Sequence, residues 1–437
     1  MMQHTISLEQ IGAAGGPMVR AVETCVHCGF CLPACPTYNV LGQEMDSPRG
    51  RIYLMKEVLE GGLALDKALP YLDKCLGCVG CVTACPSGVE YGELISPFRA
   101  LAEEKRKRGL VERLVRWMTA VTLPHPRRFR WAAKLGRVGR LFGPLVPRQI
   151  RPMLDLLPSQ LPRAVRLPQR TEAVGERRAR VALLAGCAQQ VLEPGINLAT
   201  IEVLAINGVE VVVPQRQVCC GALAWHTGDA RRARRFARQN IRVFDDQRFD
   251  AVVTNAAGCG SGIHEYPLIL EGTEEESGAR RLAEQTVDIS VLLEKLGVEE
   301  PMGFDREIRV AYHDACHLNH AQRVYRSPRV LLGSVPGVRL LEVPDGELCC
   351  GSAGTYNIDQ PEIASQLGEE KAQRVLSVDP EVVVTGNIGC MVQIQNHLAK
   401  LGSNVRVMHT VQLLAAAYRA EDPTRSGSEN MGDHAKC

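Results

Sequence analysis

The sequence has no long apolar run. No window approaches 18 uninterrupted apolar residues, so we predict no transmembrane helix. The first residues, MMQHTISLEQIGAAGGPM, lack a basic start followed by a long apolar core, so we expect no signal peptide. These two absences favour a cytoplasmic protein, or one that is peripheral on the cytoplasmic face of the inner membrane.

A nucleotide-binding signature is also missing. No glycine-rich turn joins a predicted strand to a helix in the way that dinucleotide sites require, so we predict no FAD or NAD in this chain. Aromatic residues are few, at 5%, while the hydrophobic fraction of 45% is ordinary for globular proteins. At 437 residues the chain has room for about two to four domains.

The formal net charge of +2 conceals a strong asymmetry. Residues 101–180 carry 20 lysines and arginines against 6 acidic residues, and the rest of the chain is acidic. Two interpretations of this basic stretch stay open: a solvated linker whose apolar residues pack on the next domain, or a docking surface for an acidic partner or an anionic membrane face. A nucleic-acid partner is not expected, because no recognition motif accompanies the arginines.

Cysteine, in contrast, is abundant, at 17 residues. The pattern Cys-x-x-Cys-x-x-Cys-x-x-x-Cys-Pro begins at Cys25 and again at Cys75. In bacterial two-cluster ferredoxins three cysteines at this spacing bind one cluster, and the fourth, before proline, binds the other. We therefore predict two [4Fe–4S] clusters, one on Cys25, Cys28, Cys31 and Cys85, and the second on Cys75, Cys78, Cys81 and Cys35.

Zinc binding and disulfide formation are two other possible uses of these cysteines, and both are disfavoured. Four thiolates also suit zinc, but the third cysteine and the Cys-Pro ending are typical of ferredoxins. A disulfide framework is disfavoured because the chain is long and carries no export signal.

The region around these cysteines is predicted to be a mainly helical two-cluster domain over residues 1–100. A short helix is expected from Ser7 to Ile11. Between the two patterns Ile52, Met55, Val58 and Leu59 share one helical face, which Gly61 and Gly62 end. The gap is therefore structured and is not a simple hairpin.

Residues 101–177 are predicted to form a basic, proline- and arginine-rich connector with short helices. A helix is expected over 98–120, with a basic start at 105–108. Its apolar stripe consists of Leu110, Leu114, Trp117, Met118 and Val121.

From residue 178 the pattern changes to short strands alternating with helices, which predicts α/β domains with parallel sheets. Strands are expected at 180–187, 209–213, 251–255, 308–312, 338–343, 381–385 and 405–408. Helices are expected at 194–207, 229–245 and 361–376, from 328, and after 409. The order repeats, so we predict a first repeat over 178–300 and a second over 301–420. The tail, 421–437, is expected to be disordered.

A second set of cysteines supports this duplication. Cys187, Cys219, Cys220 and Cys259 correspond to Cys316, Cys349, Cys350 and Cys390, at offsets of 129 to 131 residues. Each follows a predicted strand, and ligands of parallel sheets collect beyond the carboxyl ends of strands. Four thiols per repeat could bind a further iron–sulfur cluster, act as redox thiols, or be structural.

Polar residues lie beside these cysteines: Trp225, His226, His264, Glu265, His313, Asp314, His317 and His320. The histidines could relay protons to a quinone or another acceptor, or could form hydrogen bonds that order the loops.

This arrangement resembles the two-CCG-motif family, which includes the catalytic subunit of heterodisulfide reductase. In that family each repeat supplies Cys, then Cys-Cys-Gly, then Cys-x-x-Cys, and binds a non-cubane cluster. Here Gly262 and Gln393 occupy the last position, so each repeat lacks the fifth cysteine.

Over residues 20–420 the chain resembles the iron–sulfur subunits of bacterial glycolate oxidase. The resemblance is carried by CVHCGFCLPACPTYNVLGQEMDSPRGRIYLMKEVLEG, CLGCVGCVTACPSGVEYGEL, GCAQQVLEPGIN, LCCGSAGTYNIDQPEIASQL and TGNIGCMVQIQ. It implies an electron-transfer subunit that passes electrons from a partner FAD subunit, which oxidises glycolate to glyoxylate, to a membrane acceptor such as quinone. No catalytic residue is assigned to this chain. Subunits for lactate or glycerol-3-phosphate dehydrogenases, or a heterodisulfide-reductase-like subunit, are the alternatives.

Overall fold

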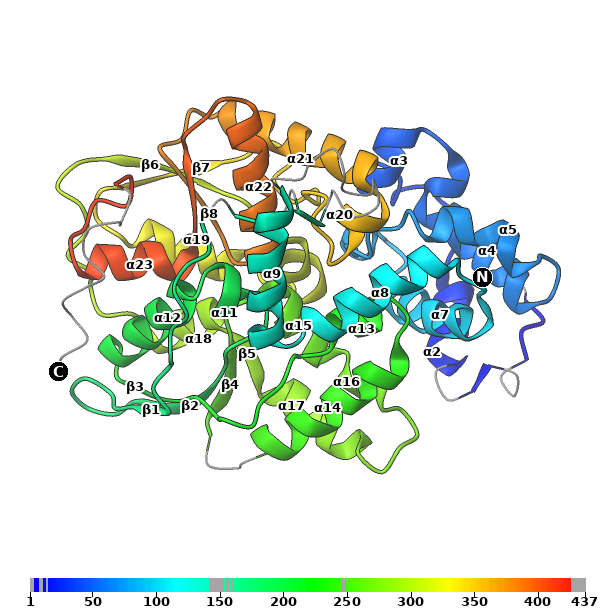
Figure 1. Cartoon of the computed structure of the whole chain (residues 1–437), viewed down its shortest axis with the longest axis horizontal. Coiled ribbons are helices and arrows are strands. Elements are labelled where there is room, and N and C mark those ends of the chain that lie inside the picture. Colours follow the sequence, from blue (N-terminus) through cyan, green and yellow to red (C-terminus); the bar gives the residue numbers. More distant parts are fainter. Residues whose placement is uncertain are drawn as a thin grey trace.

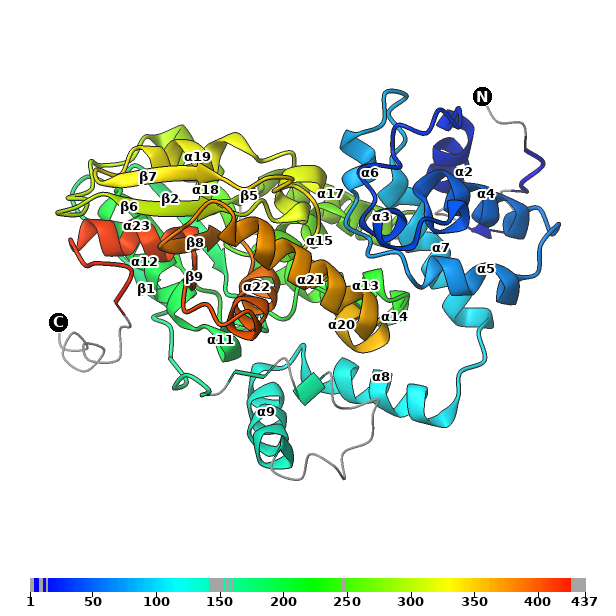
Figure 2. The ribbon, with the colours of Figure 1, turned by 90° about the horizontal axis from the view of Figure 1, so that it is seen from above.

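The computed structural model describes residues 4–7, 11–12, 15–140, 153–154, 157–158, 160–245 and 249–425. A helical lobe lies at one end of the molecule and two sheets with their helices form the rest, while the connector runs along one flank (Figures 1 and 2). No helix in these residues is long and apolar enough to cross a membrane. The helix expected from Ser7 to Ile11 falls largely outside the described residues.

The lobe that carries the first eight cysteines is helical throughout. Its elements are α2 (Gly15–Thr24), α3 (Pro36–Leu41), η1 (Glu44–Asp46), α4 (Pro48–Leu59), α5 (Leu65–Leu72), α6 (Gly80–Thr83) and α7 (Tyr91–Lys105). Helix α4 begins where the Ser47 hydroxyl accepts from the Gly50 amide at 3.0 Å. Its predicted inner face is confirmed, since Ile52 and Met55 are buried. The expected mainly helical fold is correct.

The connector differs from its prediction. The helix expected over 98–120 is two helices, α7 and α8 (Leu110–Thr122), and α9 (Pro126–Arg140) follows as a further long helix. Gly109, with φ −63° and ψ 158°, is extended and starts α8 anew. Two arginines of the basic run between the helices form ion pairs. Arg106 pairs with Asp73 at 2.8 Å, and Arg108 pairs with Glu103 at 2.6 Å.

The first repeat contains a five-stranded sheet in the order β1-β3-β2-β4-β5. The strands are β1 (Arg170–Thr171), β2 (Ala179–Leu184), β3 (Val209–Val212), β4 (Ala251–Thr254) and β5 (Thr286–Asp288), and all pairs except β1 with β3 are parallel. The sequence did not reveal β1 and β5, which have only two and three residues. Because β1 lies within the predicted connector, the last part of that stretch belongs to this sheet.

The helices of the first repeat cover both faces of its sheet. They are α11 (Gln189–Leu192), α12 (Gly195–Ile206), α13 (Ala222–His226), α14 (Ala230–Phe244), α15 (Ala257–His264), α16 (Tyr266–Ile269), α17 (Glu276–Gln285) and α18 (Ile289–Leu296). The predicted helices at 194–207 and 229–245 are confirmed as α12 and α14.

The second repeat contains a parallel four-stranded sheet in the order β7-β6-β8-β9, which matches β3-β2-β4-β5 of the first. Its strands are β6 (Ile308–Tyr312), β7 (Val338–Glu342), β8 (Val382–Thr385) and β9 (Arg406–His409). Its helices are η3 (His317–Ala321), α19 (Arg326–Gly333), α20 (Tyr356–Asp359), α21 (Pro361–Leu376), α22 (Ile388–Lys400) and α23 (Thr410–Tyr418). The predicted duplication is thus confirmed at the level of strand order.

The two repeats share one apolar core. Helix α12 packs against α23, and the largest buried cluster joins Val181 and Leu204 of the first repeat to Val383 and Leu414 of the second. Asn207 donates across this contact to the Tyr418 hydroxyl at 3.0 Å. The shared core holds the carboxyl ends of both sheets in a fixed relation.

The start of the predicted disordered tail is ordered. Pro423 is buried, and Arg406 donates to its carbonyl at 3.2 Å. Residues 421–425 therefore pack beside β9, and residues 426–437 lie outside the described part of the chain.

Candidate functional site: two cysteine loops and a thiol-lined cavity

The two cysteine patterns share a backbone conformation. His27 and Gly77 occupy equivalent positions and have φ of 55° and 67°, and Gly29 and Val79, two residues on, have φ of 89° and 53°. Left-handed backbone is unfavourable for a β-branched residue such as Val79. The loop geometry therefore overrides local preference, as expected where a chain must curl around a bound group.

The first predicted ligand set surrounds a small cavity of about 30 Å³. Cys25, Cys28, Cys31 and Cys85 line it, so the cysteine before Pro86 joins the three of the other pattern, and Cys81 of the second predicted set reaches the same cavity. The Cys85 sulfur accepts from the Val89 amide at 3.4 Å. This placement fits a cluster with crossed ligands, while ligation itself stays a prediction.

The second predicted set, Cys35, Cys75, Cys78 and Cys81, lies deeper, beside the buried Arg51 and the half-buried Arg99. Arg51 is 1% exposed, donates to the Cys35 sulfur at 3.8 Å and lies 3.5 Å from Asp46. Arg99 donates to the Cys75 carbonyl at 2.5 Å. Burial tends to raise the pKa of Cys75, but the two guanidinium groups outweigh it and hold that pKa below its ordinary value.

Thiolates are the form that binds metal, so these arginines suit a cluster site. The buried ion pair of Arg51 with Asp46 also links this site to the stability of the lobe. Removing one partner of such a pair lowers the free energy of unfolding by about 3–5 kcal/mol. Arg51 and Asp46 carry no sequence signal that places them in the site, since a side chain's approach to a thiol 16 residues away has no local pattern.

All eight cysteines of the repeats line one cavity of about 1090 Å³, together with Cys75. Within it, the sulfurs of Cys187 and Cys219 lie 3.5 Å apart, and those of Cys316 and Cys349 lie 3.9 Å apart. The structure therefore brings the cysteines at the carboxyl ends of both sheets together in a single site.

The second ligand set touches this cavity. Cys78 packs against Cys349 and donates its thiol hydrogen to the Cys349 sulfur, and this bond together with burial raises the pKa of Cys78. Around it Tyr356 donates to the Lys74 carbonyl at 2.8 Å. Thr83 and His320 are joined by a hydrogen bond of 2.7 Å. The helical lobe is thus docked on the second repeat at the predicted cluster.

The thiols of the first repeat are electrostatically unequal. Cys219 and Cys259 hydrogen-bond to the sulfur of Cys220 and hold its pKa well below the ordinary value of a thiol, while their own pKa values are raised. His226 adds to the stabilisation of the Cys220 thiolate. A buried thiolate at this position is ready for redox or metal chemistry.

Two histidines line the same cavity. The His226 and Glu265 side chains are 2.6 Å apart, and His317 lies 2.7 Å from the Ser261 hydroxyl. Burial opposes charge on His226, but Glu265 raises its pKa above the ordinary value, whereas burial lowers the pKa of His317 to about 4. With ring centroids 5.2 Å apart, the two imidazoles lie side by side with their pKa values shifted in opposite directions.

The other polar residues singled out in the sequence lie apart from this pair. Asp314 accepts both bonds of a bidentate Arg329 at 2.7 and 2.8 Å, and His320 bonds to Thr83, so both order loops. Trp225 is buried and His264 is exposed. His313 is buried beside the thiols of the second repeat.

The positions of the missing fifth cysteines are filled by packing residues. A Cβ at Gly262 would lie 2.5 Å from the Ala222 Cβ. Gln393 is 3% exposed, donates to the Ala364 carbonyl at 2.9 Å and accepts from Asn357 at 3.0 Å. A cysteine at Gly262 would clash with Ala222, and Gln393 holds its position through hydrogen bonds to neighbouring helices.

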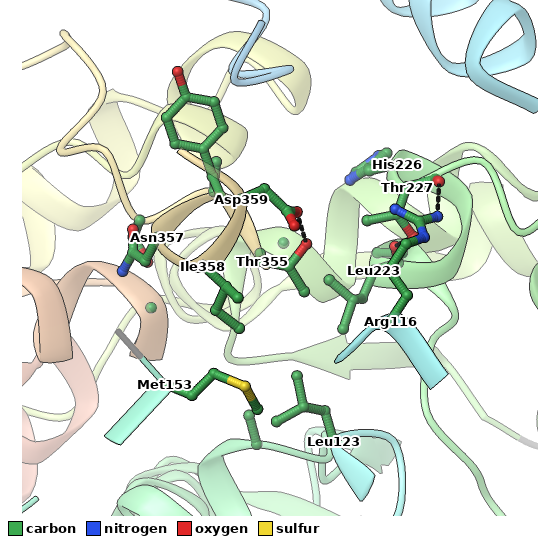
Figure 3. Close-up of a pocket in the computed structure, with 18 of the residues that line it drawn as sticks. Arg116, Leu123, Met153, Leu223, His226, Thr227, Thr355, Asn357, Ile358 and Asp359 are labelled. Carbon is green, nitrogen blue, oxygen red and sulfur yellow. Dashed lines mark hydrogen bonds between the residues drawn. The ribbon is translucent and has the colours of Figure 1, made fainter. Parts of the chain in front are cut away.

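The connector covers the cavity. Leu123 and Met153 lie across the pocket from Ile358 (Figure 3). Arg116 of α8 donates to the Thr227 carbonyl at 2.8 Å. The sequence left open that apolar residues of the connector pack on the next domain, but it did not predict that they would lie over the thiols, because apolar spacing does not say what lies beneath a helix.

Comparisons with known proteins agree with this architecture. The family "4Fe-4S dicluster domain" matches residues 21–89, and "Cysteine-rich domain" matches 181–264 and 310–395. The "Glycolate oxidase iron-sulfur subunit" of Escherichia coli (strain K12) is 38% identical over 92% of this chain and 95% of its own length. The "Probable glycolate oxidase iron-sulfur subunit" of Bacillus subtilis (strain 168) is 36% identical over 90% and 93%. The "Lactate utilization protein A" of Geobacillus kaustophilus (strain HTA426) is 32% identical over 54% of this chain and 99% of its own length.

We predict that Gly262→Ala destabilises the protein by about 1–3 kcal/mol, because the added methyl group overpacks against Ala222. Gly258→Ala on the same helix is the control, since its Cβ would meet nothing closer than Asn387 at 3.9 Å. Urea denaturation of both variants measures the difference. A Gly262→Ala variant as stable as the control would mean that a fifth side chain fits.

Proposed function

This chain belongs to the family of glycolate oxidase iron–sulfur subunits, and from that premise we propose that it carries electrons from glycolate to a membrane quinone. An iron–sulfur electron-transfer role is what the family shares. The observation that carries the specific route is the contact between Cys78 and Cys349, which joins a predicted cluster to the thiol cavity.

A partner FAD subunit oxidises glycolate to glyoxylate in this proposal. The oxidation releases two electrons, and clusters that accept one electron at a time need a flavin to divide the pair. The first cluster, on Cys25, Cys28, Cys31 and Cys85, faces the partner. Cys28 is exposed, and Val26 and Phe30 beside it expose 54% and 68% of their surface, which suits protein contact.

The second cluster, on Cys75, Cys78, Cys81 and Cys35, delivers electrons to the cavity. A volume of about 1090 Å³ accommodates a quinone head group and part of its tail. Reduction of a quinone to a quinol takes two electrons and two protons. His226 and His317 line the cavity, with the pKa of His226 raised by Glu265 and that of His317 lowered by burial, and the two imidazoles can relay protons to the quinone.

Lactate or glycerol-3-phosphate is the alternative substrate. The observation that favours lactate is the 32% identity of a lactate utilization protein over 54% of this chain. Substrate choice rests with the partner subunit, so the electron route in this chain is the same for each.

The connector docks the complex on an anionic membrane face. On α8, Leu110, Leu114 and Trp117 of the predicted stripe are 81%, 53% and 60% exposed, whereas Met118 and Val121 are half-buried, so much of the stripe faces solvent. Beside it lies a groove of about 1190 Å³ between α8 and α14. Its arginines are Arg108, Arg113, Arg116, Arg231, Arg232, Arg235, Arg238 and Arg242.

Three of these arginines carry the argument. Arg113, Arg231 and Arg235 are exposed, and within the described residues no acidic side chain pairs with them. Apolar side chains beside unpaired arginines are what an anionic bilayer surface attracts. A surface of this kind would bring the covered cavity close to membrane quinone.

Anaerobically purified protein is expected to contain about eight irons and eight sulfides per chain, four of each in every cube. Chemical analysis measures both, and EPR during stepwise reduction counts the centres. A value near four would contradict the two-cluster assignment.

Cys220→Ser is expected to lower quinone-analogue reduction by at least tenfold, because it removes the stabilised thiolate of the cavity. Dithionite reduction of the clusters, followed by their visible absorption, should be unchanged. Cys437→Ser, outside both cysteine patterns, is the matched control. If Cys220→Ser keeps full quinone reduction, the cavity is not the exit site.

Reversing three charges, with Arg113→Glu, Arg231→Glu and Arg235→Glu together, should weaken binding to anionic vesicles by at least tenfold. Each basic residue near such a surface contributes about 1 kcal/mol. The control reverses Arg323, Arg326 and Arg339, which are also exposed, lie on the second repeat and pair with acidic side chains. Sedimentation with phosphatidylglycerol vesicles measures both. Equal binding of the two variants would exclude this surface as the membrane contact.

A further inference from the structure

His313 is a buried imidazole without a hydrogen-bond partner. It lies at the end of β6 and is 0% exposed, and neither ring nitrogen is bonded to any described residue. The Gly346 carbonyl lies beside the ring, short of hydrogen-bonding geometry, and already accepts from Lys371 at 3.0 Å. Burying both ring nitrogens without a hydrogen bond costs folding free energy, and a ligand bound to the ring would offset that cost.

Two thiols face this imidazole. A ring nitrogen of His313 and the sulfurs of Cys350 and Cys390 all lie within 4.8 Å of one another, and all three residues are buried. Asn387 donates to the Cys390 sulfur at 3.4 Å, as side chains around metal-bound thiolates commonly do. The three ligand atoms come from the end of β6, the loop after β7 and the start of α22.

The separations of the three ligand atoms, none above 4.8 Å, are nearer to those around a single metal ion than to those around a cluster. Tetrahedral Zn²⁺, with Zn–S of about 2.3 Å and Zn–N of about 2.0 Å, sets its ligand atoms about 3.5–3.8 Å apart. In a four-iron cube each thiolate binds a different iron, which spreads the sulfurs more widely. The eight cysteines of the helical lobe, all described, form no trio this tight.

The first repeat lacks this arrangement. The offset of 129 residues that relates Cys187 to Cys316 places Leu184 opposite His313. Leu184 is buried in the apolar core, so the imidazole is a feature of the second repeat alone. The two repeats therefore differ at this position: the side chains that hydrogen-bond to Cys220 are all thiols, whereas Cys350 has thiols and an imidazole beside it.

We propose that His313, Cys350 and Cys390 bind one zinc-type divalent ion. Cys349 lies next in the chain to Cys350 and hydrogen-bonds to its thiol, so it can complete a tetrahedral set. The ion would tie β6, the β7 loop and α22 together directly behind the contact of Cys349 with Cys78. The proposal does not require the electron route proposed above, although Cys349, Cys350 and Cys390 also line the cavity that this route uses.

The test is the metal content of the full chain, purified anaerobically and washed with a weak chelator. Mass spectrometry for zinc and iron should find about one zinc per chain in the wild type. His313→Leu, which copies the first repeat, should lose at least nine-tenths of it, whereas His313→Cys should retain it. His397→Leu replaces another buried histidine on α22 and should keep its zinc.

X-ray absorption at the zinc edge decides the case even where a variant does not fold. The wild type should show sulfur neighbours at about 2.3 Å and a nitrogen neighbour at about 2.0 Å. Zinc retained in His313→Leu would overturn the proposal. So would a zinc-free wild type, including one whose iron content exceeds that of two cubes, which would mean that a cluster occupies the second repeat.

Discussion

Packing of α12 against α23 fixes the two repeats face to face, and the site depends on that contact. In a parallel sheet each strand delivers the residues after it to one edge. One sheet can therefore gather four thiols, but only two sheets with a shared core can place eight around a common cavity. The helical lobe then closes one side of this cavity, where Cys78 meets Cys349, and the connector covers another.

Electrostatics divides the cysteines into groups with different chemistry. Arg51 and Arg99 supply positive charge to the deeper set of the lobe, in a region too buried for water to do so. In the first repeat neighbouring thiols concentrate negative charge on Cys220. In the second repeat a neutral imidazole faces the thiols instead. The two repeats therefore share a fold but surround their thiols with different side chains. The fold permits this because it requires only that each side chain fits its packing space.

The apolar residues of the connector have two different environments in the structure. The connector's apolar stripe fits either burial against the next domain or an exposed docking face. The structure leaves Leu110, Leu114 and Trp117 exposed, while other residues of the same segment, such as Leu123, turn inward over the cavity. One element can therefore cover the site and present an apolar surface because its helices have two distinct faces.

The sequence alone determined the helical lobe, the duplicated α/β repeats and the cysteine groups, because spacing and periodicity are local properties. It missed β1 and β5, which are too short for a pattern, and joined α7 to α8 across an extended Gly109. Only the tertiary structure decided that both sets of repeat cysteines share one cavity and that Arg51 faces Cys35. Only it showed that Gly262 and Gln393 fill the places of missing cysteines and that His313 lacks a partner. These facts depend on contacts between residues far apart in the chain, which close packing fixes and local pattern does not record.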